Sequence, residues 1–284
     1  MAMRRPTPEQ LAPLGRFERF AFEVADQMNR RPALKSAAHT FLRVVGESWV
    51  TAATDKLLHV QGEAHVRDLN PDRGVFLICN HRSMFDYYAV SAVLLRNTDW
   101  VKRMYFPVRS NFFYESGAGM AVNAVMSAMA MYPPVMREGP KRAFNQYTVD
   151  VLTDLMREPG SLVGYHPEGT RNKNDDPYEL LPASVGAGNI VYHARPIVVP
   201  VFTLGLIHSF PQQVKSNFDG TGAPVTILFG APLDLSEHFE KPARLRTYKD
   251  VADHLRDALV TLGGEERRMR EELGLPRMGP APKG

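Results

Sequence analysis

Residues Gly74 to Asp86, GVFLICNHRSMFD, join a short apolar run to a polar turn. The run VFLIC follows the turn residues NPDRG, a pattern that is typical of an interior strand. The chain becomes polar at Asn80 and His81, and we expect a helix over residues 84–97. His81 is therefore expected at a strand-to-helix junction, where backbone N–H groups point outward and negative charge is favoured.

Two interpretations of Asp86 are open at this stage. Ser83 and Asp86 have the spacing of a capping box, so Asp86 on the first interpretation only caps the helix. On the second, Asp86 fixes one imidazole nitrogen of His81 and leaves the other free to take a proton from a hydroxyl. The five-residue spacing permits this pair only if His81 precedes the helix and Asp86 lies in its first turn.

A second motif, GYHPEGTR, runs from Gly164 to Arg171 and also follows an apolar segment. NHRSMFD fits the pattern N-H-x-x-x-x-D, and HPEGTR fits [FHY]-P-E-G-T-R. The two motifs in this order, about 80 residues apart, resemble the glycerolipid acyltransferase superfamily. Its members include glycerol-3-phosphate and 1-acylglycerol-3-phosphate acyltransferases. The resemblance covers roughly residues 60–235.

Composition limits the other classes of function. The 284 residues carry a net charge of +3, which suits an anionic membrane surface or a phosphorylated ligand and is too slight to indicate nucleic acid. Cys79 is the single cysteine, which excludes an internal disulfide, and we expect it to be a buried, inert thiol. Neither an 18-residue apolar run nor a signal peptide is present, so we expect a peripheral protein at the cytoplasmic face of a membrane.

The first 58 residues predict an amphipathic helical pair, over 14–29 and from Pro32 to about Leu58. Such a pair either packs on the main domain or lies in a membrane interface, with Trp49 and phenylalanines as wedges. The resemblance favours the interface, and we assign residues 1–58 to a membrane-association segment.

Residues 59–263 are expected to form the acyltransferase domain. Apolar runs predict strands at 60–63, 75–79, 101–106, 161–165, 197–202 and 225–229, and helical patterns lie at 84–97, 141–157, 187–193 and 248–262. This alternation predicts an α/β fold, a layered sandwich around a largely parallel sheet with its site at the strand carboxyl ends. Residues 264–284 are expected to be a charged, solvated helix and a frayed tail. The Met-rich segment 112–136 fits either core filling or a flexible wall for an acyl chain.

The resemblance implies roles for individual residues. His81 is the general base and Asp86 orients it, the acceptor attacks directly, and no acyl-enzyme forms. Arg171 suits a bidentate contact with phosphate, and Glu168 either holds Arg171 or binds a substrate hydroxyl. The other substrate-binding candidates are Gly169, Thr170, Arg137 and Arg109. The residues that support the motifs are Asn80, Ser83, Pro167 and Pro200, the last expected at a strand edge or end.

We therefore expect an O-acyltransferase that uses acyl-CoA or acyl carrier protein as co-substrate and needs no cofactor. The expected acceptor is a lysophospholipid, 1-acylglycerol-3-phosphate first, with another lysolipid, a glycolipid or an acyl-amino lipid as alternatives. His166 replaces the commoner Phe of the family, and residues 182–186 lack a usual Lys-x-Gly, which leaves the acceptor head group open. Two other classes are weaker: a silent lipid-binding protein, and a metal-dependent phosphoesterase with ligands His81, Asp86, His166, Glu168 and His193.

Overall fold

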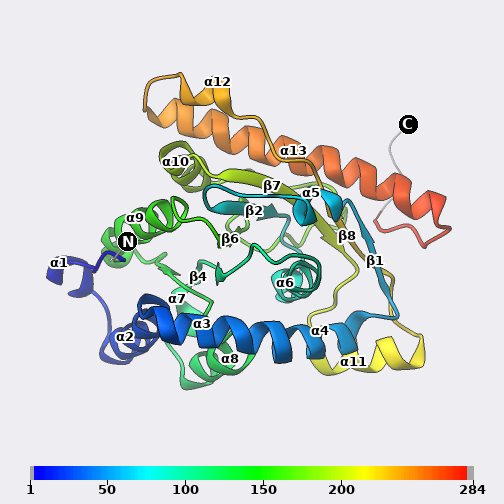
Figure 1. Ribbon diagram of the computed structural model, residues 1–284, viewed down its shortest axis with the longest axis horizontal. Helices are drawn as coiled ribbons and strands as arrows, with labels where there is room; N and C mark the ends of the chain where they lie inside the picture. Colours follow the sequence, from blue (N-terminus) through cyan, green and yellow to red (C-terminus); the bar gives the residue numbers. More distant parts are fainter. Residues whose placement is uncertain (1–2, 280–284) are drawn as a thin grey trace.

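A computed structural model describes residues 3–279, and its main sheet has six strands (Figure 1). Their order across the sheet is β1 (Leu58–Gln61), β8 (Val225–Phe229), β7 (Ile197–Leu204), β2 (Val75–Cys79), β6 (Ser161–Tyr165) and β3 (Arg103–Tyr105). Every ladder between these strands is parallel except β7 with β8. The carboxyl ends of β2, β6 and β7 therefore meet at one edge. A separate short pair joins β4 (Val108–Arg109) to β5 (Pro134–Val135).

Helices cover both faces of the main sheet, which confirms the expected α/β fold (Figure 1). The amino-terminal helices are α1 (Pro8–Leu11), α2 (Arg16–Arg30), α3 (Pro32–Phe41) and α4 (Glu47–Thr54), with a π-helical turn at Leu42–Gly46. The others are α5 (Ala64–Arg67), α6 (Asp86–Asn97), α7 (Ser110–Phe113), α8 (Gly117–Ser127), α9 (Phe144–Leu155) after a 3₁₀ turn at Gly139–Ala143, α10 (Val185–Ala194), α11 (Phe210–Asp219), α12 (Ser236–Phe239) and α13 (Leu245–Glu272). No helix within residues 3–279 combines the length and apolarity needed to cross a bilayer.

Strand β2 is buried on both faces because it lies at the centre of the sheet. Successive side chains of a strand point to opposite faces. Phe76 and Ile78 accordingly join the core formed with α9, α10 and α13, whereas Leu77 and Cys79 join the core formed with α6. This arrangement explains why the strand reads as an uninterrupted apolar run in the sequence.

The expectation that Pro200 marks a strand edge or end is wrong. Pro200 lies inside β7, opposite Ile78 of β2. Its carbonyl accepts a hydrogen bond from the N–H of Gly230 (2.9 Å), just beyond the end of β8. The nitrogen and carbonyl of a strand residue point to the same side, so the proline nitrogen faces the place where β8 has ended. The missing N–H therefore omits only the second bond to Gly230, at the end of the ladder with β8.

Residues 264–272 also need correction, because α13 continues to Glu272 and is not solvated on every side. Glu266 and Arg270 are buried and form an ion pair one helical turn apart. Glu266 also accepts hydrogen bonds from Thr226 in β8 (2.6 Å) and Tyr178 (2.5 Å). Charged residues that read as surface in the sequence thus dock the helix against the sheet.

The amino-terminal helices pack on the main domain. In α2, Phe22 is buried against Tyr132 and Tyr147. Asp26 accepts hydrogen bonds from the hydroxyls of the same two tyrosines (2.8 and 3.1 Å), and Asn29 donates to the carbonyl of Met129 (2.7 Å). Removal of this segment would take the Asp26 carboxylate from the two hydroxyls and the side-chain donor of Asn29 from the carbonyl of Met129, so α2 is part of the core.

This packing predicts unequal effects of two phenylalanine substitutions in α2. Phe22→Ala should lower the free energy of unfolding by about 3–5 kcal/mol, because it opens a cavity in the core. Phe20 is 53% exposed, so Phe20→Ala should change it by no more than about 0.5 kcal/mol. Denaturant unfolding of both variants checks the prediction. Equal, small losses would contradict the packing of α2 as core.

Candidate active site

The turn after β2 is fixed to the sheet by Asn80. Its side-chain amide donates to the carbonyl of Thr203 in β7 (2.9 Å), and its carbonyl oxygen accepts from the N–H of the same residue (2.8 Å). Asn80 is fully buried, so both bonds are shielded from water. They hold the end of β2 beside β7 at the point where the chain leaves the sheet, and the next residue is His81.

Asp86 is the first residue of α6, and its carboxylate reaches back to the turn. One oxygen, Oδ2, accepts from the backbone N–H groups of Arg82 and Ser83 (both 2.9 Å) and lies 3.1 Å from Nδ1 of His81. Helix α6 starts two residues later than a capping box would require, and no such box forms. Ser83 instead accepts from the N–H of Phe85 (3.2 Å) and donates to the carbonyl of Ile207 (3.3 Å).

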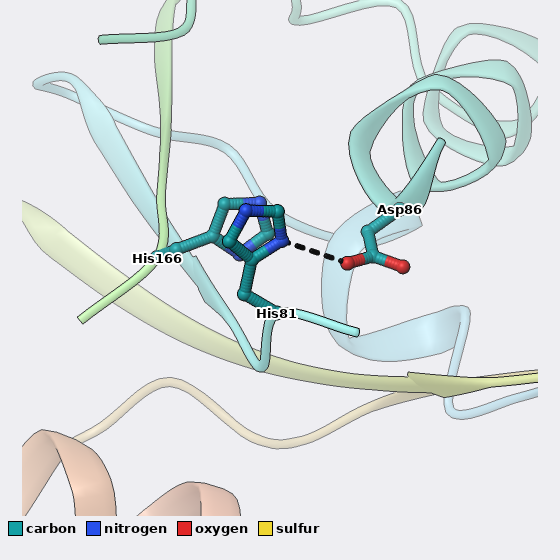
Figure 2. Close-up of side chains that lie close together, drawn as sticks. All are labelled: His81, Asp86 and His166. Carbon is teal, nitrogen blue, oxygen red and sulfur yellow. Dashed lines mark hydrogen bonds and ion pairs between the residues drawn. The ribbon is translucent and has the colours of Figure 1, made fainter. Parts of the chain in front are cut away.

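These contacts define the tautomer of His81. Because Asp86 Oδ2 accepts, the proton of the neutral ring lies on Nδ1 and Nε2 keeps its lone pair. Figure 2 shows the imidazole pointing one nitrogen at Asp86. The His81 side chain is 22% exposed while that of Asp86 is 2% exposed. The pair therefore combines a buried orienting carboxylate with an accessible base, as the second interpretation of the motif requires.

His166 lies face to face with His81. The ring centroids are 3.8 Å apart with an angle of 11° between the planes (Figure 2). Nδ1 of His166 lies 3.0 Å from the carbonyl of Cys79, and Tyr87 packs against the ring with a centroid distance of 4.5 Å. Burial and the neighbouring His81 lower the pKa of His166 to about 3. His166 is thus a neutral, stacked support for the base.

The charge state of the pair suits a base at neutral pH. Burial, with the positive charges of Arg171 and Arg109, lowers the pKa of His81 to about 4. Burial raises the pKa of Asp86 to about 6, against the opposing effect of the backbone N–H groups of Ser83 and Arg82. Attraction between the partners would shift both values the other way, and burial outweighs it. Above pH 6 the ring is neutral and the carboxylate ionised, and the first proton taken up belongs to the coupled pair.

Glu168 does not hold Arg171, which was one of its two expected roles, and its contact with a substrate hydroxyl stays a prediction. Its carboxylate oxygens accept from the backbone N–H groups of His81 and Leu181 (both 2.9 Å). The carbonyl of His81 in turn accepts from the N–H of Asn172 (2.8 Å). Glu168 is 7% exposed, and these contacts make it a brace for the backbone of the catalytic turn. Neither contact involves Arg171.

Two of the arginine candidates converge on the second motif. Arg137 and Arg109 (3.4 Å) both donate to the carbonyl of Gly169. Gly169 has a φ of +61°, a conformation that a side chain disfavours. Its turn is closed by a hydrogen bond from its N–H to the carbonyl of His166 (2.9 Å). The glycine backbone thus gathers two guanidinium groups beside the base.

Arg171 follows Gly169 and the partly exposed Thr170 in the chain. Its Nη1 is 3.5 Å from Nδ1 of His208, and its Nε is buried without a hydrogen-bond partner among the described residues. The carbonyl of Pro167 accepts from the N–H of Ser184 (2.8 Å) and ties the motif to the start of α10. Arg171 therefore retains unused donors near the base.

Three residues at the site were not predicted from sequence. Arg82 donates to the carbonyls of Asn172 and Asn174 (3.1 and 2.9 Å), which joins the two motifs. His208 follows β7 and contacts Arg171. Because carboxyl ends of parallel strands share an edge, the polar residues after β7 offered a signal for His208. Arg82 and Asn172 lie within or beside the motifs but carried no distinguishing pattern.

The proposed metal-ligand set is only partly assembled. Nitrogen and oxygen atoms of His81, Asp86 and His166 lie within 4.8 Å of one another. The two rings are stacked, however, so their in-plane lone pairs run side by side and do not meet at one ion about 2 Å away. Glu168 is engaged with backbone N–H groups, and His193 lies at the end of α10, 2.8 Å from the hydroxyl of Tyr248. The arrangement favours hydrogen-bonded catalysis over metal ligation.

Some methionines of the segment 112–136 line a cavity, and others pack in the core. Met126 and Met131 line a cavity of about 30 Å³ beside Tyr87, enough for about one water molecule. Met120 and Met129 pack with the core. The acyl-chain wall thus stays a prediction that requires these flexible side chains to move. Cys79 is buried, and burial raises the pKa of its thiol well above the ordinary value, as expected for an inert group.

Comparison with known proteins identifies the family and the fold of the chain. No curated protein matches the chain. Among solved structures, the 1-acyl-sn-glycerophosphate (LPA) acyltransferase PlsC from Thermotoga maritima has a similar fold, with a TM-score of 0.50 and 16% identity over 86% of this chain and 87% of that chain. The family model described as Acyltransferase matches residues 58–203, just over half of the sequence and including both motifs. The chain therefore belongs to the acyltransferase family.

Proposed function

We propose that this acyltransferase moves a fatty acyl group from acyl-CoA or acyl carrier protein to the hydroxyl of a lysophospholipid, with 1-acylglycerol-3-phosphate as acceptor. The observation that carries the proposal is the pair of His81 and Asp86 at a strand end, with Nε2 of His81 free and three arginines nearby. No other cofactor is needed for this chemistry.

The reaction needs one proton to move twice. Nε2 of His81 takes the proton of the acceptor hydroxyl as its oxygen attacks the thioester carbonyl. The resulting imidazolium is stabilised by Asp86, which is already aligned through Nδ1. When the tetrahedral intermediate collapses, the C–S bond breaks and the proton passes to the leaving thiolate. Glu168 and Asn80 contribute by fixing the backbone on either side of the base.

The arginines support a phosphorylated acceptor. Arg171 has an unpartnered buried Nε, and Arg109 and Arg137 donate only to a shared carbonyl among their described hydrogen bonds. Guanidinium groups match the geometry of phosphate oxygens and bind them with two parallel hydrogen bonds. A phosphate placed between these groups would hold the acceptor hydroxyl near Nε2. The positive charges of Arg171 and Arg109 also help keep His81 deprotonated by lowering its pKa.

We further propose that the enzyme sits peripherally on the cytoplasmic face of a membrane. Phe17 and Phe20 of α2 are exposed although α2 is docked, as are Val44 and Val45 of the π-helical turn. Exposed apolar side chains on amphipathic helices bind the headgroup region of a bilayer. The amino-terminal helices would thus serve both the core and the membrane contact.

Loss of the base is the first test. His81→Ala should lower kcat by at least about 10²–10⁴-fold while the protein stays folded, because proton transfer to a positioned base supplies a factor of that size. Asp86→Asn should cost nearly as much through the wrong tautomer. Turnover with purified protein and circular dichroism check both. Near wild-type turnover in folded His81→Ala protein would refute the mechanism.

The pH profile gives an independent readout of the same pair. The active form has neutral His81 and ionised Asp86, so kcat/KM should fall as the pH drops through about 6, where Asp86 takes up a proton. A protonated Asp86 can donate to Nδ1, which moves the ring proton to Nε2 and removes the base. Asp86→Asn should abolish this limb. A profile that stays flat down to the pKa of His81, about 4, would exclude Asp86 as the controlling group.

Arg171 separates a phosphorylated acceptor from a neutral one. Arg171→Lys should lower kcat/KM for 1-acylglycerol-3-phosphate by roughly ten- to a hundred-fold, because a charged bidentate contact becomes a single one. The loss should appear in the KM of the acceptor and hardly in that of the thioester. Arg137→Ala should behave alike, with a less than additive loss in the double variant. A change confined to the donor KM would assign Arg171 to the phosphates of acyl-CoA or carrier protein.

The membrane contact is tested without deleting core helices. Phe17→Ser with Phe20→Ser should reduce flotation with vesicles that contain phosphatidylglycerol, because both rings are exposed. The matched control is Leu245→Ser with Val260→Ser, which removes two exposed apolar side chains from α13 on the far side of the molecule (Figure 1). Equal flotation of the two double variants would place the membrane contact elsewhere.

A further inference from the structure

A second, larger cavity lies away from the active site. It has a volume of about 280 Å³ and lies between the α2–α3 junction, strand β3 and the end of α9. None of the described residues that line it belongs to the active site. Its charged lining residues are Arg30, Lys35, Lys102, Arg103, Asp154 and Glu158. The cavity is therefore large enough for a small molecule, and charged side chains of both signs line it.

The charges of this lining do not cancel. Asp154 already pairs with Arg4 (2.6 Å) and with Arg157 (3.3 Å), both outside the cavity lining. Arg30 pairs with Asp26 in the same way (2.7 Å). The groups that remain are Lys35, Lys102 and Arg103, against the single carboxylate of Glu158. The cavity thus carries an excess of positive charge.

Lys35 is the most unusual of these cations because it is 4% exposed and has no carboxylate partner among the described residues. Its ammonium donates to Asn29 (2.7 Å) and to the carbonyl of Met104 (2.6 Å), and lies 3.9 Å from the ring centre of Tyr105. Burial and the charge of Arg103 lower its pKa to about 7. Lys35 is therefore only partly protonated at neutral pH, and an anion in the cavity would favour its charged form.

Arg103 supplies a free donor. Its Nη2 donates to the carbonyl of Pro159 (2.8 Å) and lies 3.9 Å from Glu158. Its Nε is buried with no hydrogen-bond partner among the described residues. Buried N–H groups nearly always have a partner. An oxygen atom of a ligand could accept a hydrogen bond from this Nε.

We propose that this cavity is a second ligand site that binds a small anion with phosphate or carboxylate groups. The anion contacts Arg103 and Lys102 and compensates the positive charge of Lys35. Because α2 and α3 form one wall and β3 and α9 the other, the bound anion also joins the amino-terminal helices to the α/β domain. The phosphate can come from a soluble metabolite or from a lipid headgroup.

Calorimetric titration of the full-length protein with inorganic pyrophosphate at low salt tests the site. We expect one anion to bind at this site, in addition to any that the active-site arginines hold. Arg103→Gln should weaken binding about tenfold, as expected when a charged hydrogen bond is lost. Lys102→Gln should weaken it less and cannot disturb the fold, because Lys102 is exposed. The charge-matched controls are Arg67→Gln, exposed on α5, and Arg171→Gln in the active site, and both should retain this binding.

Two outcomes would overturn the proposal: no heat of binding at millimolar pyrophosphate, or binding that Arg171→Gln weakens while Arg103→Gln and Lys102→Gln do not. The second outcome would place the anion in the active site. A competition arm identifies the source of the phosphate once binding is found. Displacement of pyrophosphate by phosphatidylcholine vesicles with phosphatidic acid, but not by pure phosphatidylcholine, assigns the site to a headgroup, and no displacement assigns it to a soluble anion.

Discussion

Oδ2 of Asp86 accepts hydrogen bonds from Nδ1 of His81 and from the backbone of Arg82 and Ser83. A buried carboxylate must be fully hydrogen-bonded, and only a turn that stays outside the helix presents three donors to one oxygen. The same atom therefore fixes the shape of the turn, the start of α6 and the tautomer of the base. The spacing of the motif follows from this requirement.

The position of His81 depends on contacts that extend outward from this oxygen. Asn80 attaches the strand end to β7, and Glu168 joins the N–H of His81 to that of Leu181. Leu181 is held in turn because its carbonyl accepts from Arg256 of α13 (3.2 Å). The carboxyl-terminal helix thus reaches His81 through three hydrogen bonds, which gives it a role in positioning the candidate site.

The bounds of an element could be predicted from the sequence where a local pattern decides the structure. Strands 75–79 and 161–165 have the predicted bounds, because apolar runs between turns leave little freedom. Predictions were wrong where contacts between residues distant in sequence decide the structure. Pro200 is tolerated in a central strand only because β8 ends beside it, and Glu266 reads as a surface charge because its partners Thr226 and Tyr178 are remote in sequence. The brace formed by Glu168 was missed for the same reason, since a carboxylate beside an arginine suggests an ion pair.

The burial of β2 between β6 and β7 has a consequence for synthesis. Both neighbours follow β2 in the chain, so VFLIC leaves the ribosome long before either edge of the strand can be paired. A strand that is apolar on both faces and unpaired at both edges is prone to aggregate. Chaperone binding during translation is therefore expected to concentrate on the segment that precedes His81, and the turn that carries His81 can reach its final position only after β7 has emerged.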